Sequence, residues 1–565
     1  MPPDPLDDSC FRLIDSWIDQ CRMHGKCSLP TSVTLPKRVI AISIDPSESP
    51  RLRVTNNELG QYVILSHCWG KRALVALTQS LITQYQEAIQ VEELPRSFKD
   101  AIEITRKLGF RYLWIDALCI IQDNAEDWAQ EVVKMASYYG LSALMISATD
   151  AEDSSKGILN VRDASYSPFL GKKRKYCFQQ HLFRSDWEIR ESILATRGWA
   201  AQERMLAPRI LHYTKRQIIW EFAVGIIPEA SGLYTPNSFQ LGYQKSKLQP
   251  LVTEALDQTY PASHGFSIAN KEPGVDPRVA TLDKLRIRHE CVREYSSRSL
   301  SVPSDRFHAI AGVAKIVNSK GELVTYLTSL WSAYLASSLA WRRLSSRLST
   351  PAIYTAPSWS WASVRGGVGQ SVSGVEMNLH MRIDETESFL REPFHLLLID
   401  GQIVLQDERN IYGAVLEGSY ITVEGSCATY TEFGRLSKDL FQCHPHNLYW
   451  FFESRTNRGG DTSLSYQQER GNVAQDYWLP VKAASLQHIT EDLAAYDFCI
   501  FLTATEWYDR MGFVSILLLN WVDREAKVAQ RAGLAELWFG DFPDREQSIR
   551  SFRAFDWQRW TVRLI

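Results

Sequence analysis

Residues 62–70 read Tyr-Val-Ile-Leu-Ser-His-Cys-Trp-Gly, an apolar run that ends in polar and reactive side chains. Residues 113–122 have the same character and read Leu-Trp-Ile-Asp-Ala-Leu-Cys-Ile-Ile-Gln. Short apolar runs of this kind are typical of buried strands in an α/β sheet, which present functional side chains at their carboxyl ends. Residues 197–203 read Arg-Gly-Trp-Ala-Ala-Gln-Glu, with a Glu four residues after a Trp at an expected helix start. We expect the three stretches to converge on one site.

Strands and helices alternate around the first two stretches. Expected strands cover residues 62–66, 111–116 and 141–148, and expected amphipathic helices cover residues 97–108 and 125–139. Short joins between these elements favour a parallel sheet with right-handed crossovers and flanking helices. The sequence therefore predicts an α/β fold for this part of the chain.

Beyond this part of the chain, the residue pattern changes at several points, and each change predicts a different kind of structure. Between residues 228 and 279, periodicity gives way to Pro, Gly, Ser, Asn and Gln, which predicts a long insertion or linker. Helical periodicity resumes over residues 281–295 and 306–317, and the stretch 324–343 is apolar almost all round, as in a buried helix. Beyond Val364, short apolar runs separated by turns predict a mostly β module.

A chain of 565 residues is too long for one hydrophobic core. The patterns divide it into an N-terminal helix and lead-in strand (1–50), an α/β domain (51–225), a linker or insertion (226–280), a helical region (281–364) and a β-rich C-terminal module (365–565).

Composition narrows the class of protein. A net charge of −3 provides no basic surface of the kind that binds nucleic acid or an anionic membrane. No apolar run reaches the ~18–20 residues that a membrane span needs, and the acidic, proline-rich N-terminus is unlike a secretory leader. Ten cysteines scattered singly are typical of reduced thiols. We therefore expect a cytoplasmic protein without a nucleic-acid partner or a membrane span.

Cys21, His24 and Cys27 follow one another at three-residue intervals near the N-terminus. A structural zinc site needs a fourth ligand and usually a second paired cluster, and the sequence offers neither. Packing at a helix end with a free thiol is the alternative, and we expect no metal.

The ordered motifs resemble the fungal heterokaryon-incompatibility (HET) domain. Matching points outside the three stretches are Leu35-Pro-Lys-Arg38, Leu94-Pro-Arg-Ser, Glu126-Asp-Trp, Met135, Tyr138, Arg209, Ser304-Asp-Arg306, Gly312, Trp331 and Ala356-Pro-Ser-Trp-Ser-Trp361. Members of this family trigger or license cell death when genetically different hyphae fuse. The resemblance implies a role in non-self recognition and programmed cell death.

The HET core in turn resembles the Toll/interleukin-receptor (TIR) domain, and some TIR domains hydrolyse NAD. In those enzymes a Glu follows a Trp by four positions on a helix, and Trp199 and Glu203 show this spacing. The resemblance implies a TIR-like parallel sheet with Glu203 as the catalytic residue. Its carboxylate would stabilise the oxocarbenium-like cation formed when nicotinamide leaves the ribose, or would orient water against it. NAD is then the candidate substrate, and no cofactor is expected.

Other side chains near the expected strand ends would bind the ligand under this interpretation. The candidates are Ser66, His67, Trp69, Trp114, Asp116 and Trp199. Ser66, His67 and Asp116 would contact ribose hydroxyls or phosphate in the crevice above the sheet. Trp69 or Trp114 would stack on adenine or nicotinamide.

Structural roles for the same residues stay open. Glu203 would form ion pairs with Arg197, Arg204 or Arg209, Asp116 would cap backbone amides, and His67 and the tryptophans would belong to the core. A rival catalytic arrangement has Cys119 as nucleophile, His67 as base and Asp116 as orienting acid. The apolar surroundings of Cys119 count against it, because they raise the pKa of a thiol.

A non-enzymatic function is the remaining class. The α/β domain would then be a switch that signals by self-assembly or by binding a protein partner, with the β-rich module sensing the trigger. Reuse of the domain in another regulatory or metabolic role is also open.

Overall fold

The computed structural model contains two compact units, Met1–Glu322 and Leu323–Ile565. The residues that it describes are 2–23, 32–70, 75–162, 187–223, 225–230, 235–236, 241–257, 277–321, 323–332, 335–344, 351–370, 396–429, 431–432, 448–452, 481–482, 497–507, 511–539 and 556–565. Within these residues, no helix is both long enough and apolar enough to cross a membrane.

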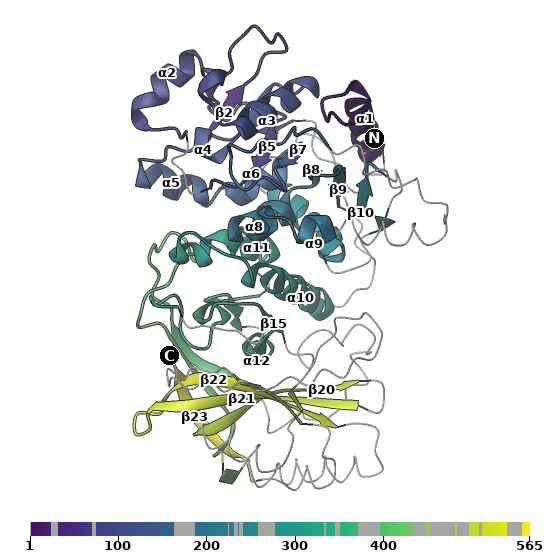
Figure 1. Cartoon of the computed structure of the whole chain (residues 1–565). Helices are drawn as coiled ribbons and strands as arrows, with labels where there is room; N and C mark the ends of the chain where they lie inside the picture. The colour runs from purple at the N-terminus through teal and green to yellow at the C-terminus, as the bar shows by residue number, and fades with distance from the viewer. Residues whose placement is uncertain are drawn as a thin grey trace, which may run out of the picture. The chain divides into compact units, whose positions relative to one another are not determined.

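The first unit is built on a nine-stranded sheet with the order β11-β10-β9-β8-β7-β5-β6-β2-β3 (Figure 1). The strands are β2 (Arg38–Ala41), β3 (Arg51–Val54), β5 (Val63–Ser66), β6 (Tyr112–Trp114), β7 (Leu144–Ser147), β8 (Arg209–Tyr213), β9 (Ile218–Phe222), β10 (Gly225–Pro228) and β11 (Thr235–Pro236). The four central strands, β8, β7, β5 and β6, are parallel, which confirms the predicted parallel sheet. Antiparallel strands extend it on both sides.

The order of the central strands creates a switch in direction. Strand β5 lies between β6 and β7, so the chain first adds a strand on one side of β5 and then continues on the other side. In open α/β sheets, ligands bind at the carboxyl ends of strands at such a point. The three strands end at Ser66, Trp114 and Ser147, close to the polar residues that the sequence singled out.

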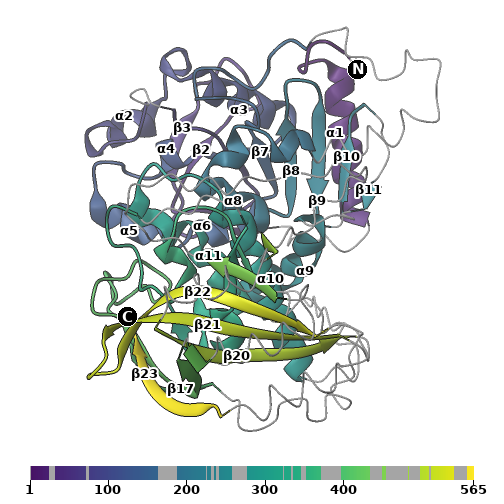
Figure 2. The ribbon, with the colours of Figure 1, turned by 60° about the horizontal axis from the view of Figure 1, so that its bottom comes forward.

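Helices cover both faces of this sheet. They include α1 (Asp8–Met23), α2 (Ile82–Glu87), α3 (Arg96–Lys107), α4 (Asp116–Cys119), α5 (Ala125–Val132), α6 (Met135–Leu141), α8 (Gly198–Leu206), α9 (Leu241–Asp257), α10 (Pro277–Ser296) and α11 (His308–Val317). Helix α1 runs alongside β9, where the Trp17 and Trp220 rings stack 6.2 Å apart (Figure 2). The next residue of β9, Glu221, points to the opposite face, as alternation along a strand requires. There it pairs with Arg204 of α8.

Two expectations for this unit need correction. The predicted helix 125–139 is two helices, α5 and α6, separated by a turn at Val133 and Lys134. Helix α5 starts where the Asn124 side chain accepts hydrogen bonds from the backbone N–H groups of Glu126 and Asp127, which is the usual N-cap arrangement. The region 228–279, which we expected to be irregular, contains helix α9, and this helix tolerates Pro250 within its span.

The second unit is rich in β structure, as predicted. Its strands are β12 (Tyr326–Leu327), β13 (Leu330–Trp331), β14 (Trp341–Arg343), β15 (Val368–Gln370), β16 (Leu397–Gln402), β17 (Tyr420–Thr429), β18 (Leu448–Phe452), β19 (Val481–Lys482), β20 (Phe498–Trp507), β21 (Met511–Asp523), β22 (Val528–Phe539) and β23 (Gln558–Leu564). Strand β23 pairs with both β17 and β22, so β17, β20, β21, β22 and β23 form a closed ring.

The predicted helix 324–343 is wrong. This stretch forms the hairpin β12–β13, the short helix α12 (Leu335–Leu339) and strand β14. Thr328 and Ser329 have φ values of 43° and 74°, which a two-residue hairpin turn uses and an α-helix excludes. The Tyr326 and Trp331 rings then meet across the hairpin at 4.8 Å. Aromatic pairing across strands therefore explains the apolar pattern that resembles a buried helix.

Candidate functional site

The ends of β5 and β6 bring several predicted residues together. Ser66 is the last residue of β5 and His67 follows it, while Asp116 begins α4 just after β6. The His67 Nδ1 atom lies 3.8 Å from an Asp116 carboxylate oxygen. The Ser66 hydroxyl donates a hydrogen bond to Glu203 of helix α8. Residues from three distant parts of the sequence thus meet at one edge of the sheet.

The sheet register explains why α8 faces polar side chains here. Ser66 pairs with Ser147 of β7, and Ser147 pairs with His212 of β8. Paired residues of neighbouring strands lie on the same face, so these three side chains form a polar row beneath α8. Helix α8 contacts this region through two successive residues, Glu203 and Arg204. Glu203 accepts a hydrogen bond from Ser66. Arg204 forms an ion pair with Glu221, and Glu221 also contacts His212.

Glu203 is deeply buried, with 5% of its surface exposed. Burial raises the pKa of its carboxyl to about 7, although the Arg197 charge and the hydrogen bond from Ser66 act in the opposite direction. Acid and carboxylate forms are therefore both populated near neutral pH. A carboxyl with this property is suited to accepting or donating a proton.

His67 and Asp116 form a second part of the site. Burial lowers the pKa of His67 to about 4, so the imidazole is neutral at physiological pH. Its Nε2 atom has no hydrogen-bond partner among the residues that the structure describes. Trp69 Nε1 donates to Asp116 Oδ2 at 2.8 Å, and the His67 and Trp69 rings stack 6.4 Å apart. The Asp116 side chain keeps 20% of its surface exposed, so solvent reaches this part of the site.

Two of the tryptophans that were predicted to bind the ligand contact neither His67 nor Asp116 but other side chains. Trp114 is fully buried and packs against the rings of Tyr138 and Tyr139. Trp199 is half-buried, and its indole N–H donates to Asp305 Oδ2 at 3.1 Å. Trp69 is thus the tryptophan of the candidate set that contacts Asp116.

The arginines that were expected to form ion pairs with Glu203 bond to other groups. Arg204 pairs with Glu221 at 2.8 Å, and Arg209 donates to the Ala143 carbonyl at 3.2 Å. Arg197 donates to the carbonyl of His67 and influences Glu203 through its charge. The Ser66 hydroxyl makes the hydrogen bond to the Glu203 carboxyl, while the nearby Tyr139 hydroxyl donates to the Leu65 carbonyl at 3.5 Å.

The alternative nucleophile, Cys119, lies in an apolar environment. It is fully buried, and burial raises the pKa of its thiol to about 12. The neutral thiol is a weak nucleophile, so this environment disfavours a role as nucleophile at neutral pH.

A buried charged cluster that no sequence motif indicated lies next to the polar row. His212 Nε2 lies 2.7 Å from Glu221 Oε2, and Lys245 Nζ lies 3.6 Å from Glu221 Oε1. Thr149 bonds to the other side of the His212 ring at 3.3 Å. Lys245 comes from the region expected to be a linker, so no local spacing could have linked it to β8 and β9.

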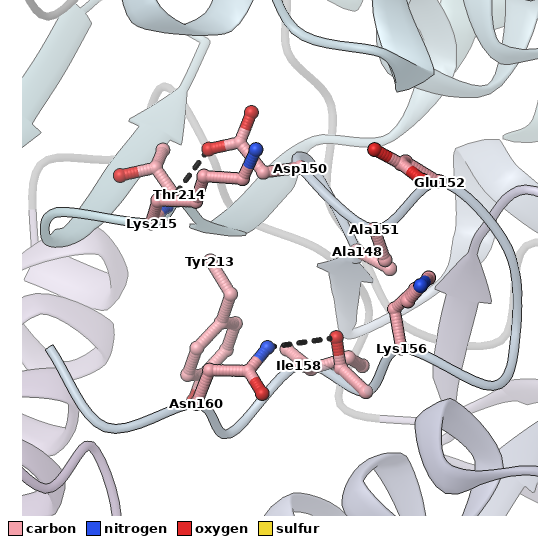
Figure 3. Close-up of a pocket in the computed structure, with 11 residues that line it drawn as sticks. Ala148, Asp150, Ala151, Glu152, Lys156, Ile158, Asn160, Tyr213, Thr214 and Lys215 are labelled. Carbon is pink, nitrogen blue, oxygen red and sulfur yellow. Dashed lines mark hydrogen bonds between the residues drawn. The ribbon is translucent and has the colours of Figure 1, made fainter.

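A hollow of about 260 Å³ lies at the carboxyl ends of β7 and β8 (Figure 3). It is lined by residues that follow β7 and by the end of β8, and none of the predicted site residues lines it. No group of three or more His, Cys, Asp or Glu side chains suited to a metal ion occurs among the described residues. His24 and Cys27 lie outside those residues, so the structure does not describe their spacing with Cys21.

Comparison with known proteins gives one match. Residues 62–203 match the family model described as Heterokaryon incompatibility protein (HET), which supports a protein with a heterokaryon-incompatibility domain. The matched range contains the strands β5, β6 and β7 and ends at Glu203. No curated protein and no solved structure matches the chain. The resemblance to TIR domains therefore stays a prediction.

Proposed function

We propose that this protein acts in fungal non-self recognition, and that residues 62–203 form the domain that triggers programmed cell death. The HET match supports the biological role. The main support for a functional site is the contact between Ser66 and Glu203. Through this contact, a buried carboxyl with a raised pKa lies at the switch point of the sheet. Burial of an ionisable group without an ion pair is costly, and such groups are enriched at functional sites.

The mechanism that we favour is signalling by assembly. Ser66 and Glu203 form a buried hydrogen bond inside the domain, and the neighbouring Tyr139 donates to the Leu65 carbonyl at 3.5 Å. Buried polar contacts of this kind are typical of a network that fixes one conformation. A trigger that disturbed this network would change the position of α8 relative to β5. The altered surface would then bind a second copy or a protein partner.

NAD hydrolysis is the second candidate function. It is favoured by the position of Glu203 near Asp116, whose side chain is partly exposed and bonded to Trp69. An ionised Glu203 would stabilise the positive charge that develops on the ribose as nicotinamide leaves. Glu203 itself is 5% exposed, whereas the Asp116 side chain keeps 20% of its surface exposed.

One experiment with two measurements tests these candidates. The full chain is expressed from an inducible promoter in a filamentous fungus while viability is counted, and the purified protein is incubated with NAD while nicotinamide release is measured. The variants are Glu203→Gln and Glu203→Ala, with Glu87→Gln as the control because Glu87 is exposed on α2. Circular dichroism and light scattering report folding and assembly.

The outcomes separate the mechanisms. Cell death and nicotinamide release that both disappear in Glu203→Gln would support the enzyme. Cell death that persists in this variant, without nicotinamide release from any protein and with assembly detected by light scattering, would support the contact mechanism. If the unaltered chain never reduces viability in hosts that differ in genotype, the proposed role in cell death is wrong.

A further inference from the structure

We infer that helix α9 is a displaceable latch, and that its released form docks on a second copy of this chain. The inference rests on the assembly mechanism proposed above, and it specifies the surfaces that meet. Helix α9 lies beyond the matched residues 62–203, yet it contacts α8, the helix that contains Glu203 (Figure 1). It also contacts α6, α10 and α11, all within the first unit. We call the surface that these four helices present to α9 the docking surface.

One apolar stripe attaches α9 to the docking surface. Leu248, Val252 and Leu256 follow one another at four-residue spacing, so they lie on one face of the helix, and all three are buried. At Gly140 of α6, a Cβ would lie 2.9 Å from Val252 Cγ1 and 3.1 Å from Leu256 Cδ1. The stripe therefore packs directly on α6 at a position where a larger side chain would keep the two helices apart.

Two polar side chains of α9 bind the C-terminal end of α8. Lys245 Nζ donates to the Arg204 carbonyl at 3.2 Å, and Gln249 Nε2 donates to the Leu206 carbonyl at 2.9 Å. The last carbonyls of a helix have no partner within that helix, so side-chain donors often bind them. Glu203 immediately precedes Arg204 in the chain. Docking of α9 therefore stabilises the end of α8 next to the candidate site.

Release of α9 has a small electrostatic cost. Lys245 Nζ lies 3.6 Å from Glu221, but Glu221 also contacts Arg204 at 2.8 Å and His212 at 2.7 Å, and these partners remain when Lys245 leaves. The Lys245 ammonium regains its hydration, which offsets much of the ion-pair energy that is lost. The freed carbonyls of α8 can bond to water. The polar contacts thus make docking of α9 specific without making it strong.

The connections of α9 allow it to move without disturbing the centre of the sheet. Strand β11, which precedes it, is a two-residue strand at the edge of the nine-stranded sheet. The nineteen residues 258–276 connect it to α10. A chain of that length spans at most roughly 65 Å when it is fully extended.

A second copy is the partner because each released chain carries both halves of the contact. Release exposes the stripe of α9 and the docking surface to water, which favours any contact that covers them again. The stripe and the docking surface are complementary within one chain, so the same contacts can form between two chains. Exchange of an identical element between two copies is a low-cost route to a dimer.

Lys245→Glu in the full chain tests the release. The new carboxylate faces Glu221 from a buried position, and repulsion between like charges should expel α9. Lys247→Glu is the matched control, because Lys247 is half-buried on the same helix and lies 3.6 Å from Asp283. Hydrogen exchange followed by mass spectrometry measures release, and light scattering measures the oligomeric state.

We expect the α9 amides of Lys245→Glu to exchange at least about tenfold faster than those of Lys247→Glu, with a dimer whose fraction rises with protein concentration. Lys247→Glu should behave like the unaltered chain. If Lys245→Glu does not fold by circular dichroism, Gln249→Leu replaces it with the same expected outcomes, because it removes the amide that binds the Leu206 carbonyl.

Engineered cysteines identify the surfaces that meet. Residues 140 and 252 are close enough for a disulfide when both are cysteine. In the double variant Gly140→Cys with Val252→Cys, oxidation should hold α9 in its own chain and prevent dimers, and a reductant should reverse this. One chain with Lys245→Glu and Gly140→Cys is then mixed with another that has Lys245→Glu and Val252→Cys. A disulfide should link the two unlike chains, and neither chain alone should give this product.

Three results would overturn the inference. They are equal exchange rates of α9 in Lys245→Glu and Lys247→Glu, faster exchange without a dimer, and a dimer in which residues 140 and 252 of unlike chains do not cross-link. Failure of the proposed function has a different signature. A cross-linked Lys245→Glu dimer that never reduces the viability of a fungal host would retain the latch and refute the role in cell death.

Discussion

The Ser66 hydroxyl donates a hydrogen bond to the Glu203 carboxyl and so joins the end of β5 to helix α8. The two residues are 137 positions apart in the sequence, and both side chains are buried. This contact is the centre of the candidate site, because Tyr139, Arg197 and Asp116 all influence the pKa of Glu203.

Glu203→Ala should lower the free energy of unfolding by about 1–3 kcal/mol at pH 7, because it leaves the buried hydroxyl of Ser66 without its acceptor. Glu203→Gln keeps an acceptor and should cost less. Urea unfolding followed by circular dichroism measures both. Glu87→Ala on exposed α2 is the control and should stay within ~0.5 kcal/mol of the unaltered chain. An equal loss in the control and in Glu203→Ala would contradict the assigned contact.

Stability should depend on pH through Glu203. The pKa of its carboxyl is raised from 4.5 to about 7 in the folded protein, mainly by burial. Below the unfolded pKa both states hold the proton, and the stabilising contribution is complete. As the pH rises from 4.5 to 7 the unfolded chain releases its proton first, so stability falls, by a total on the order of 3 kcal/mol. The loss is complete above about pH 7.

Urea unfolding of the unaltered chain and of Glu203→Gln between pH 5 and 8 isolates this contribution. The difference in unfolding free energy between the two proteins should change steadily up to pH 7 and then level off. A difference that is constant across this range would show that Glu203 does not have a raised pKa.

Asp127→Ala should destabilise the first unit strongly. The Asp127 carboxylate is buried and pairs with Arg38 and with Lys37 Nζ at 2.8 Å, and it also accepts the Ile121 backbone N–H at 3.0 Å. Removing it leaves the buried Arg38 without its ion pair, which should cost about 3–5 kcal/mol. Chemical unfolding measures the loss. The neighbouring exposed Glu126→Ala is the control, and a similar result for both variants would refute the assignment.

Gly312→Ala should disturb the contact between α11 and α8. A Cβ at this position would lie 2.7 Å from Gln202 Oε1 and would also overlap Ala136, so neighbouring helices must move apart. The Gly312 backbone N–H also donates to Gln202 Oε1 at 2.7 Å. Overpacking of this kind costs about 1–3 kcal/mol. A thermal melt should show a lower midpoint for Gly312→Ala and little change for Ala311→Ser, a half-buried neighbour on the same helix.

The sequence alone predicted the central α/β elements because their signals are local. The apolar runs that became β5, β6 and β7 are short and end in polar residues, and the stripe of α3 repeats at the helical period with Gly109 just beyond its end. The motifs also predicted that Ser66, Asp116 and Glu203 would meet. In the fold, Ser66 contacts Glu203, and Asp116 contacts His67 and Trp69.

The tertiary structure decided what depends on pairing between distant segments. The antiparallel flanks, the closed ring of β17, β20, β21, β22 and β23, and the hairpin in place of helix 324–343 all depend on strand register, which local periodicity does not encode. The same applies to the partners of Arg204 and Tyr213. Arg204 pairs with Glu221 instead of Glu203, and Tyr213 lines a hollow that no motif indicated, because β8 and β9 bring their side chains into place only when the sheet assembles.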